Sequence, residues 1–181
     1  HQAECNFKYP EINGTFVYWF FLKALRDACN LPIDMENEFI PELCISTISD
    51  VMPLHNINRF VVKKGIEIMP YHHRRWLKSW LAYANKTKFT AEDLAFDLIP
   101  AINVTSRLTE AEESAIFYTR ENEYESKAWL QYIQDLNAVR KKLQFDLQNK
   151  IETLYSDWLK HPFILIPGDG FKKGLLGPVA G

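Results

Sequence analysis

The chain has 181 residues, of which 47% are hydrophobic and 14% aromatic, so it is long enough for one ordinary domain with a substantial core. Its charged fraction of 24% is that of an ordinary folded protein and excludes an intrinsically disordered chain. A formal net charge of −2 gives no overall signature of nucleic-acid binding, so such a function would depend on local basic patches.

The three cysteines, Cys5, Cys29 and Cys44, have neither the spacing of a zinc site nor the even number of a disulfide framework. They predict reduced thiols in a cytoplasmic protein. Residues 14–25 (GTFVYWFFLKAL) are strongly apolar but cover only about half the length that a membrane span needs. We therefore expect a buried core helix here and no membrane partner.

The hydrophobic pattern predicts mostly helix along the first hundred residues. Residues 50–56 form a break around Pro53 and are expected to be a loop. Thr90 is expected to cap the last of these helices, with Asp93 three residues on as in a capping box, and Pro100 to end it. The expected helices cover residues 15–29, a segment from Glu36 or Phe39 to about Ile48, 57–69, 74–84 and 90–100.

The clearest predicted element is a long helix over residues 121–160. At 1.5 Å per residue it would span roughly 55 to 60 Å, and a helix of that length in a chain this short is expected to bridge two bodies. Residues 163–166 follow as a predicted strand, so we place a domain boundary at the end of the helix. The apolar positions of the helix recur every three or four residues, at Trp129, Tyr132, Leu136, Val139, Leu143, Leu147, Ile151, Leu154 and Trp158.

Asp50 is the first candidate for chemistry. It stands where a predicted helix meets the loop with Pro53, and small hydroxyl residues precede it. A loop carboxylate displayed in this way can bind a divalent cation, or it can simply cap the following helix. The residues by themselves favour neither interpretation.

Asn103, Ser106 and Arg107 lie in a polar segment, PAINVTSRL (100–108), after a predicted helix end. The planar guanidinium of an arginine can donate two hydrogen bonds at once to a phosphate. On composition alone, a structural arginine that caps backbone carbonyls is the favoured interpretation.

Two further features carry histidines or positive charge. His72 and His73 could ligate a metal, but Arg74 and Arg75 follow them, and an exposed helix start is the favoured interpretation. Residues 59–78 hold six Lys or Arg against one acid. Such a run can contact phosphates, but it is more often a solvated face.

Four segments, in chain order, carry a resemblance. STISDVMPLHNINRFVVKKGI (46–66) has a Ser-Thr pair, an aspartate, a V-x-P-L turn and then Asn-Arg before a glycine. FDLIPAINVTSRL (96–108) resembles a loop of the type F-x-x-x-P-R-I-N-A-A-G-R, and LNAVRKKLQFDLQNKI (136–151) resembles an L-N-x-x-R helix. FILIPGDGFKKGLLGPVAG (163–181) resembles the opening of a DHHA1 domain. All four are similar to segments of the RecJ-like single-stranded-DNA-specific exonucleases of the DHH/DHHA1 phosphoesterase superfamily.

The resemblance implies an α/β family fold, of which this chain is a mostly α-helical part. Residues 1–120 would be the C-terminal part of a DHH catalytic domain, 121–160 the long connecting helix, and 161–181 the start of a DHHA1 domain with its first strand. Most metal ligands of such an enzyme would lie upstream of His1. We therefore expect an internal segment of a larger nuclease, inactive when alone.

The resemblance also implies roles for individual residues. The family's enzymes use two Mn²⁺ (or Mg²⁺) ions, and Asp50 matches the one aspartate ligand that falls inside this chain. Arg107 would hold a phosphate in the concavity that Asp50 faces, with Asn103 ordering the loop and Ser106 beside the substrate. Ala101 and Ser106 stand where the family has Arg and Gly, which indicates a divergent branch.

The implied function is 5′-to-3′ hydrolysis of single-stranded DNA in repair and recombination. The implied partners are single-stranded DNA and, beyond it, single-strand-binding or replication proteins. Two alternatives stay open: a phosphodiesterase for short oligoribonucleotides or cyclic dinucleotides, and a catalytically degenerate RecJ-like replication scaffold. Intact DxD and DHH motifs upstream of His1 would argue for catalysis, and their loss for a scaffold.

Overall fold

The computed structural model describes residues 6–110, 112–157, 160–163, 165–168 and 170–180. The chain divides into two compact units, His1–Ile99 and Pro100–Gly181. None of the described residues lies in a strand, and most are helical. The mostly α-helical character expected from the sequence is confirmed.

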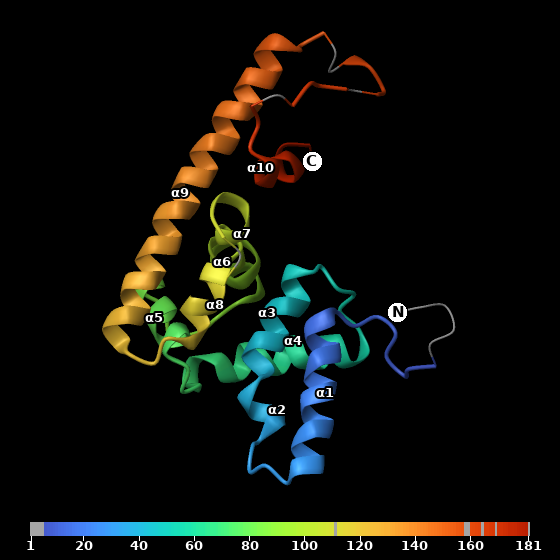
Figure 1. The fold of residues 1–181 in the computed structure, drawn as a ribbon, viewed down its shortest axis with the longest axis vertical. Coiled ribbons are helices and arrows are strands. Elements are labelled where there is room, and N and C mark those ends of the chain that lie inside the picture. Colours follow the sequence, from blue (N-terminus) through green and yellow to red (C-terminus); the bar gives the residue numbers. More distant parts are fainter. Residues whose placement is uncertain (1–5, 111, 158–159, 164, 169, 181) are drawn as a thin grey trace. The chain divides into compact units, whose positions relative to one another are not determined.

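The first unit is built from helices (Figure 1), and its core is aromatic. Trp76 and Trp80 are buried, and the Trp80 ring stacks on Phe89 with the two centroids 4.9 Å apart. The elements follow the predicted helices closely, except that Phe39 divides the second one in two. They are α1 (Gly14–Cys29), α2 (Met35–Glu38), α3 (Ile40–Ser49), α4 (Asn56–Ile68), η1 (Met69–Tyr71), α5 (Arg75–Ala84) and η2 (Asp93–Leu98).

Helix α1 forms as predicted but is not a buried helix. Asn13 caps its start by accepting a 3.0 Å hydrogen bond from the backbone N–H of Phe16, and Asn30 ends it in the left-handed conformation. Phe16 is buried, whereas one flank of the helix is exposed, so the expected core helix is wrong. Apolar residues can form a helix on their own, but burial requires neighbours on every side. The exposed apolar side chains of α1 are Val17, Tyr18, Phe21 and Leu25.

Gly65 allows α3 and α4 to pack closely, and Figure 1 shows the two helices crossing. A Cβ added at Gly65 would lie 2.4 Å from Cβ and 2.9 Å from Sγ of Cys44. Burial raises the pKa of the Cys44 thiol to about 12, so this cysteine is an unreactive core residue. Cys29 is exposed and, like Cys44, unbridged, and Cys5 lies outside the described residues.

Replacing Gly65 by Ala should lower the free energy of unfolding by about 1 to 3 kcal/mol, because the added methyl group overpacks the α3–α4 contact. Urea denaturation followed by circular dichroism would measure the loss. Gly14→Ala is the matched control, since a Cβ at Gly14 meets nothing within 4 Å. Equal stability of the two variants would contradict the close packing.

The predicted capping box at Thr90 is present. The backbone N–H of Asp93 donates to Oγ1 of Thr90 over 3.1 Å, and that of Thr90 donates to Oδ2 of Asp93 over 2.9 Å. The expected helix end at Pro100 is wrong, because η2 continues into α6 (Ile99–Ile102). A proline ring clashes with the carbonyl four residues earlier in a regular α-helix. Here η2 is π-helical, with bonds five residues back, and this wider turn accommodates the proline.

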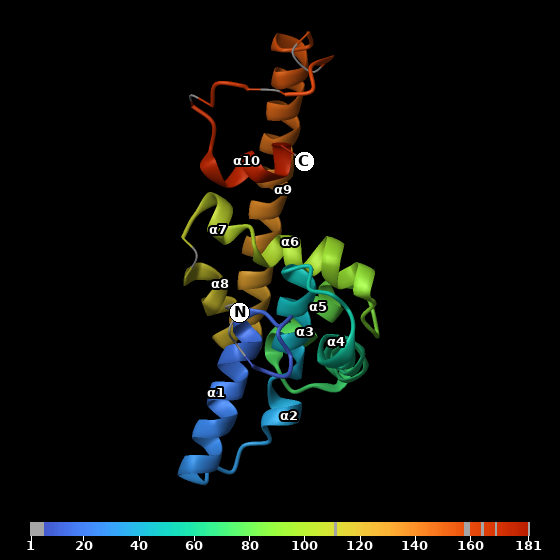
Figure 2. The ribbon, with the colours of Figure 1, turned by 90° about the vertical axis from the view of Figure 1, so that its right-hand side faces the viewer.

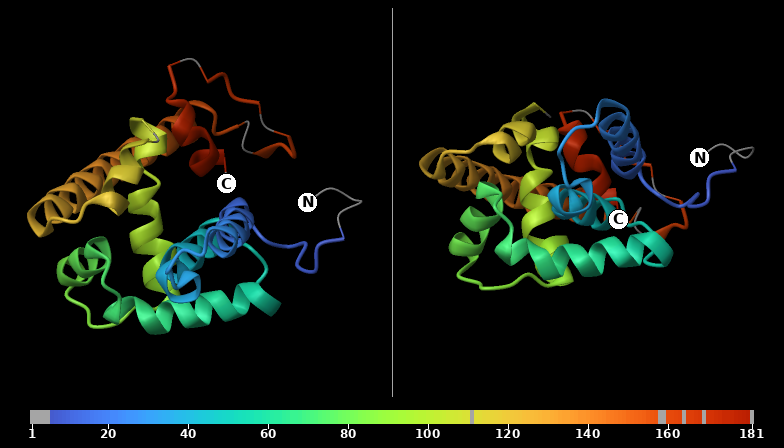
Figure 3. Two further views of the ribbon diagram at one scale, coloured as in Figure 1. Left: turned by 60° about the horizontal axis from the view of Figure 1, so that its bottom comes forward. Right: turned by 90° about the horizontal axis from the view of Figure 1, so that it is seen from below.

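The second unit is built along the long helix α9 (Glu123–Leu154) (Figure 2). Its 32 residues make it about 48 Å long, shorter than predicted. Helix α8 runs back along α9 (Figure 3). The Tyr132 hydroxyl joins the two helices by donating to Glu113 over 2.8 Å. The helix lies within this unit, and its role as a connector between two family domains stays a prediction. The shorter elements are α7 (Thr105–Leu108), α8 (Glu112–Thr119) and α10 (Lys173–Ala180).

The buried face of α9 differs from the predicted one. Tyr132 and Val139 belong to the apolar pattern, but their side chains are 37% and 51% exposed. Trp158 of that pattern lies outside the described residues. Both faces of the helix carry apolar residues, so their spacing alone could not decide which one α7, α8 and α10 cover. The buried residues are Ser126, Leu130, Ile133, Asn137 and Leu147.

The predicted strand at residues 163–166 is wrong for Phe163, Leu165 and Ile166, which are not in a strand, and Ile164 lies outside the described residues. A strand needs hydrogen bonds to a neighbouring strand, and the described part of the chain holds none. The glycine-spaced segment that follows forms α10. Among the described helices, none is both long and apolar enough to cross a membrane.

Candidate functional site

Asp50 ends α3 and opens the turn that leads to α4. Its Oδ2 accepts a 2.9 Å hydrogen bond from Nδ2 of Asn13, the same side chain that caps α1. Asn13 is buried and Asp50 is exposed, so the carboxylate is oriented from the protein side and open to solvent. The residue before α4 is His55, and the alternative that Asp50 is a plain N-cap is therefore wrong.

The backbone directly after Asp50 is strained. Val51 has a φ of 52°, in the left-handed region, and its side chain is 87% exposed. For a β-branched residue this conformation is a genuine outlier that costs about 1 to 3 kcal/mol. Two backbone hydrogen bonds hold it, from Val51 N to Ile48 O (3.0 Å) and from Met52 N to Thr47 O (3.1 Å). The end of α3 thus holds an unfavourable backbone conformation directly after Asp50.

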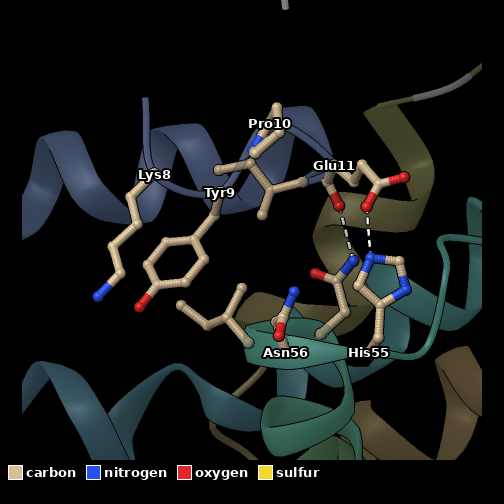
Figure 4. A pocket seen from close by; sticks show the side chains of 9 residues that line it. Lys8, Tyr9, Pro10, Glu11, His55 and Asn56 are labelled. Atoms are coloured by element: carbon tan, nitrogen blue, oxygen red, sulfur yellow. Dashed lines mark hydrogen bonds and ion pairs between the residues drawn. The ribbon is translucent and has the colours of Figure 1, made fainter. Parts of the chain in front are cut away.

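The loop after this turn is fastened to the segment before α1 (Figure 4). The His55 ring is bonded to the Glu11 carboxylate. Nδ2 of Asn58, which is buried, donates to the carbonyls of Glu11 (2.7 Å) and Pro53 (3.0 Å). These contacts border a small pocket of about 30 Å³, which is enough for a water molecule. Asn58 of the Asn-Arg pair is therefore a loop-positioning residue.

The described residues do not by themselves assemble a two-ion centre around Asp50. The group of three potential ligands that they bring within 4.8 Å of one another does not include it. A carboxylate oxygen suits Mg²⁺ or Mn²⁺, but such an ion requires several oxygen ligands. Asp50 fits as one contributor to a metal centre.

Arg107 is the last-turn basic residue of α7 in the second unit. Its Nη1 donates to the carbonyl of Gly174 over 3.1 Å, and the residue is half-buried. The Ser106 hydroxyl donates to the carbonyl of Asn103 over 2.9 Å, which closes the local turn. None of the ion pairs between described residues involves Arg107. Its guanidinium is thus held by a neutral carbonyl.

A second arginine, Arg140 of α9, lies close enough to Arg107 for the two positive charges to repel each other. Partial burial, and next the charge of Arg107, lower the pKa of Arg140. Arg140 donates to Oδ1 of Asn137 (3.0 Å) and to Oε1 of Gln144 (2.9 Å), both neutral groups. Gln144 in turn donates to the Pro178 carbonyl over 3.2 Å. Two half-buried guanidiniums with neutral hydrogen-bond partners form an electropositive cluster, which suits an anion.

Gly174 brings α10 against α7 at this cluster. A Cβ there would lie 2.3 Å from the carbonyl oxygen and 2.6 Å from Cα of Arg107, and backbone cannot move aside easily. Gly174→Ala should therefore lower the free energy of unfolding by about 1 to 3 kcal/mol and displace Arg107. Gly177→Ala in the same helix is the control, since its Cβ meets nothing within 4 Å. Matching urea midpoints for the two variants would contradict this contact.

The structure gathers some of the predicted residues but not all. Asn103, Ser106 and Arg107 share one local turn of the second unit, whereas Asp50 belongs to the first. That Arg107 and Asp50 face one concavity stays a prediction. Arg140 was not among the residues predicted for the site, although the L-N-x-x-R pattern contains it.

The exposed helix start expected at His72 and His73 is only partly right. His73 is exposed, but His72 is half-buried, and α5 begins later, at Arg75. Within the basic run 59–78, Lys64 pairs with Glu67, and Arg74 pairs with Glu38 and Glu42. The exposed basic residues of the run are Arg59, Lys63, Arg75 and Lys78.

No family model matches the chain. Curated relatives do: RecJ, a single-stranded-DNA-specific exonuclease, of Bacillus subtilis is 25% identical over 99% of this chain. The RecJ proteins of Escherichia coli and Thermus thermophilus are 28% and 31% identical over 83% and 92% of it. These alignments cover 22%, 28% and 24% of the relatives. The chain therefore spans about a quarter of the length of the curated relatives it matches.

Solved structures agree with the sequence comparison. Crystal structures of Thermus thermophilus RecJ in complex with Mg²⁺ and with Mn²⁺ both superpose with a TM-score of 0.81, at 28% and 27% identity. They match 97% and 99% of this chain with 27% and 26% of theirs. An exonuclease RecJ bound to manganese gives 0.80 at 28% identity, over 98% of this chain and 45% of that one. Along almost its whole length, the chain is similar in sequence and fold to part of RecJ.

Proposed function

We propose that this chain is part of a metal-dependent exonuclease that hydrolyses single-stranded DNA in the 5′-to-3′ direction. The observation that most supports this proposal is the cluster of Arg107 and Arg140. Both guanidiniums are half-buried and hydrogen-bonded to neutral groups. Such a cluster favours binding of a phosphate. No carboxylate of the described residues neutralises these arginines, and a phosphate can accept charge-assisted hydrogen bonds from them. The relatives that match the chain are named single-stranded-DNA-specific exonucleases, and no observation favours the oligoribonucleotide, cyclic-dinucleotide or scaffold alternatives.

Asp50 is proposed as the metal-binding residue of this chain. Two divalent ions, Mn²⁺ or Mg²⁺, would supply an activated water and stabilise the attacking and leaving oxygens of the phosphodiester. Asn13 orients the Asp50 carboxylate through Oδ2, and Oδ1 has no hydrogen-bond partner among the residues that the structure describes. The strained turn at Val51 supports this role, because strain of this kind concentrates at functional sites.

Arg107 is proposed to bind a phosphate of the strand, with Asn103 and Ser106 shaping the turn that presents it. The guanidinium has five donors, and the bond to Gly174 uses only Nη1. Arg140 is proposed to keep the local electrostatic potential positive, while its own N–H groups remain hydrogen-bonded to Asn137 and Gln144. A phosphate would then meet a preorganised donor with no carboxylate to displace.

The division of the chain is likewise a proposal. Residues 1–120 are assigned to a DHH catalytic domain, 121–160 to the connecting helix and 161–181 to the start of a DHHA1 domain, and the resemblance of the four segments supports this. Single-strand-binding or replication proteins are proposed as partners, and the cytoplasm as the location.

End-labelled single-stranded DNA tests the proposal. The full-length protein that carries this chain should shorten it from the 5′ end with Mn²⁺ and lose that activity with a chelator. The purified 181 residues should be inactive, because one carboxylate cannot assemble a two-ion centre. Robust Mn²⁺-stimulated digestion by the 181 residues would show that the ligands are misplaced. A full-length protein with intact DxD and DHH motifs that leaves the DNA uncut would favour the oligoribonucleotide or cyclic-dinucleotide alternative, and loss of these motifs would favour the scaffold alternative.

A further inference from the structure

Three potential metal ligands from two separate segments meet in the first unit. Glu38 is the last residue of α2, and His72 and His73 follow η1. One ligating atom from each residue lies within 4.8 Å of those of the other two. Glu38 and His72 are half-buried, whereas His73 is exposed, so the cluster is reachable from solvent but partly shielded. Asp50 is not a member of the group.

The surroundings of His72 fix the tautomer of its ring. Its Nε2 lies 3.2 Å from the carbonyl of Asn37, and a carbonyl can only accept, so Nε2 carries the proton. Nδ1 therefore keeps its lone pair, which accepts a 3.4 Å hydrogen bond from the backbone N–H of Arg74. A cation at Nδ1 would replace this bond. A ring N–H bonded to a backbone carbonyl is the usual support of a metal-binding histidine. Burial, and next the charge of His73, lower the pKa of His72.

The other two ligands are also close to a binding geometry. The His72 and His73 rings stack with their centroids 4.5 Å apart, and Nε2 of His73 lies 3.4 Å from Oε1 of Glu38. Metal–ligand bonds of 2.0–2.1 Å in a tetrahedral site place the ligand atoms about 3.4 Å from one another. The Glu38–His73 separation already has this value, whereas the His72 ring, which is stacked on His73, must tilt before its lone pair can point to the same ion.

The charges around the cluster leave room for a cation. The guanidinium of Arg74 is shared between Glu38 (3.0 Å) and Glu42 (3.4 Å). Two carboxylates thus face one positive side chain. If a cation binds Glu38, Arg74 can stay paired with Glu42. Cation binding therefore does not leave the guanidinium of Arg74 without a negatively charged partner.

We propose that Glu38, His72 and His73 bind a borderline divalent cation of the Zn²⁺ type, which joins α2 to the segment after η1. Two imidazoles and one carboxylate form a ligand set that Zn²⁺ prefers, whereas Mg²⁺ prefers ligand sets made only of oxygen atoms. The fourth position is left to water. Because the cation binds only the folded arrangement of two separate segments, it stabilises the first unit by an amount that grows with the logarithm of its concentration once this exceeds the dissociation constant.

Calorimetric titration of the metal-free full chain with ZnCl₂ tests the site. We expect one equivalent to bind and to raise the melting temperature, while MgCl₂ at the same concentration does neither. His73→Ala should weaken Zn²⁺ binding at least about tenfold. This side chain is 65% exposed, so its removal should leave the fold intact, as circular dichroism would confirm. His161→Ala, which removes an exposed histidine of the second unit, should bind like the wild type.

Two further measurements make the result decisive. Glu38→Gln keeps the shape of the side chain and should also lose at least about tenfold in affinity. Co²⁺ in place of Zn²⁺ should give the visible absorption of a four-coordinate ion in the wild type and not in His73→Ala. The proposal is overturned if the wild type fails to bind Zn²⁺ at 1:1. It is equally overturned if His73→Ala binds Zn²⁺ as tightly as the wild type does, or if His161→Ala loses as much Zn²⁺ affinity as His73→Ala.

Discussion

Replacing Asp50 by Ala in the full-length protein should lower Mn²⁺-dependent hydrolysis of single-stranded DNA by about a thousandfold or more. A ligand carboxylate supports metal ions that contribute several kcal/mol to the transition state, and each 1.4 kcal/mol is tenfold in rate. The fold should survive, because Asp50 is exposed and its side chain accepts one hydrogen bond, from Asn13. Single-turnover digestion of end-labelled DNA, with circular dichroism of the same samples, would measure both effects.

Two companion variants separate charge from shape. Asp50→Asn retains an oxygen that can accept from Asn13 but removes the negative charge, so it should be nearly as inactive as Asp50→Ala. Asp97→Ala, which removes an exposed carboxylate of η2, should leave the rate unchanged. A normally folded Asp50→Ala protein that cuts at the wild-type rate would show that Asp50 is only a turn residue.

Removing the guanidinium of Arg107 should have the second largest effect. Arg107→Ala in the full-length protein should cost about 2 to 4 kcal/mol of transition-state stabilisation, the range for the loss of one preorganised donor. This corresponds to roughly thirtyfold to a thousandfold in kcat/KM. Arg107→Lys should fall between Ala and the wild type, because it keeps the charge but loses the planar fork.

The control for Arg107 must account for the loss of one positive charge. Lys142→Ala removes an exposed charge from α9, close in the chain to Arg140, and should change kcat/KM little. The Arg107 variants also lose the bond to Gly174, so the urea midpoints of all variants need to be compared. If Arg107→Ala loses stability but keeps kcat/KM, then Arg107 only ties α7 to α10, and the phosphate role is wrong.

Local sequence was sufficient for most helices. The spacing of apolar residues and the side-chain caps lie within a few positions of each other, so α1, α4, α5 and the Thr90–Asp93 capping box could be predicted. The order of the four segments was likewise sufficient for the RecJ-like resemblance, which the comparisons confirm. The helices depend on short-range spacing and the resemblance on the order of short motifs, and both can be read along the chain without knowledge of tertiary contacts.

Burial and partners were decided by tertiary structure. The apolar flank of α1 is exposed, and α9 buries Asn137 rather than Val139, because the neighbouring helices choose the face. The cluster of Arg107 and Arg140, and the meeting of Glu38 with His72 and His73, join residues far apart in the chain. Helical periodicity says which residues share a face, but only the packed helices determine what that face contacts.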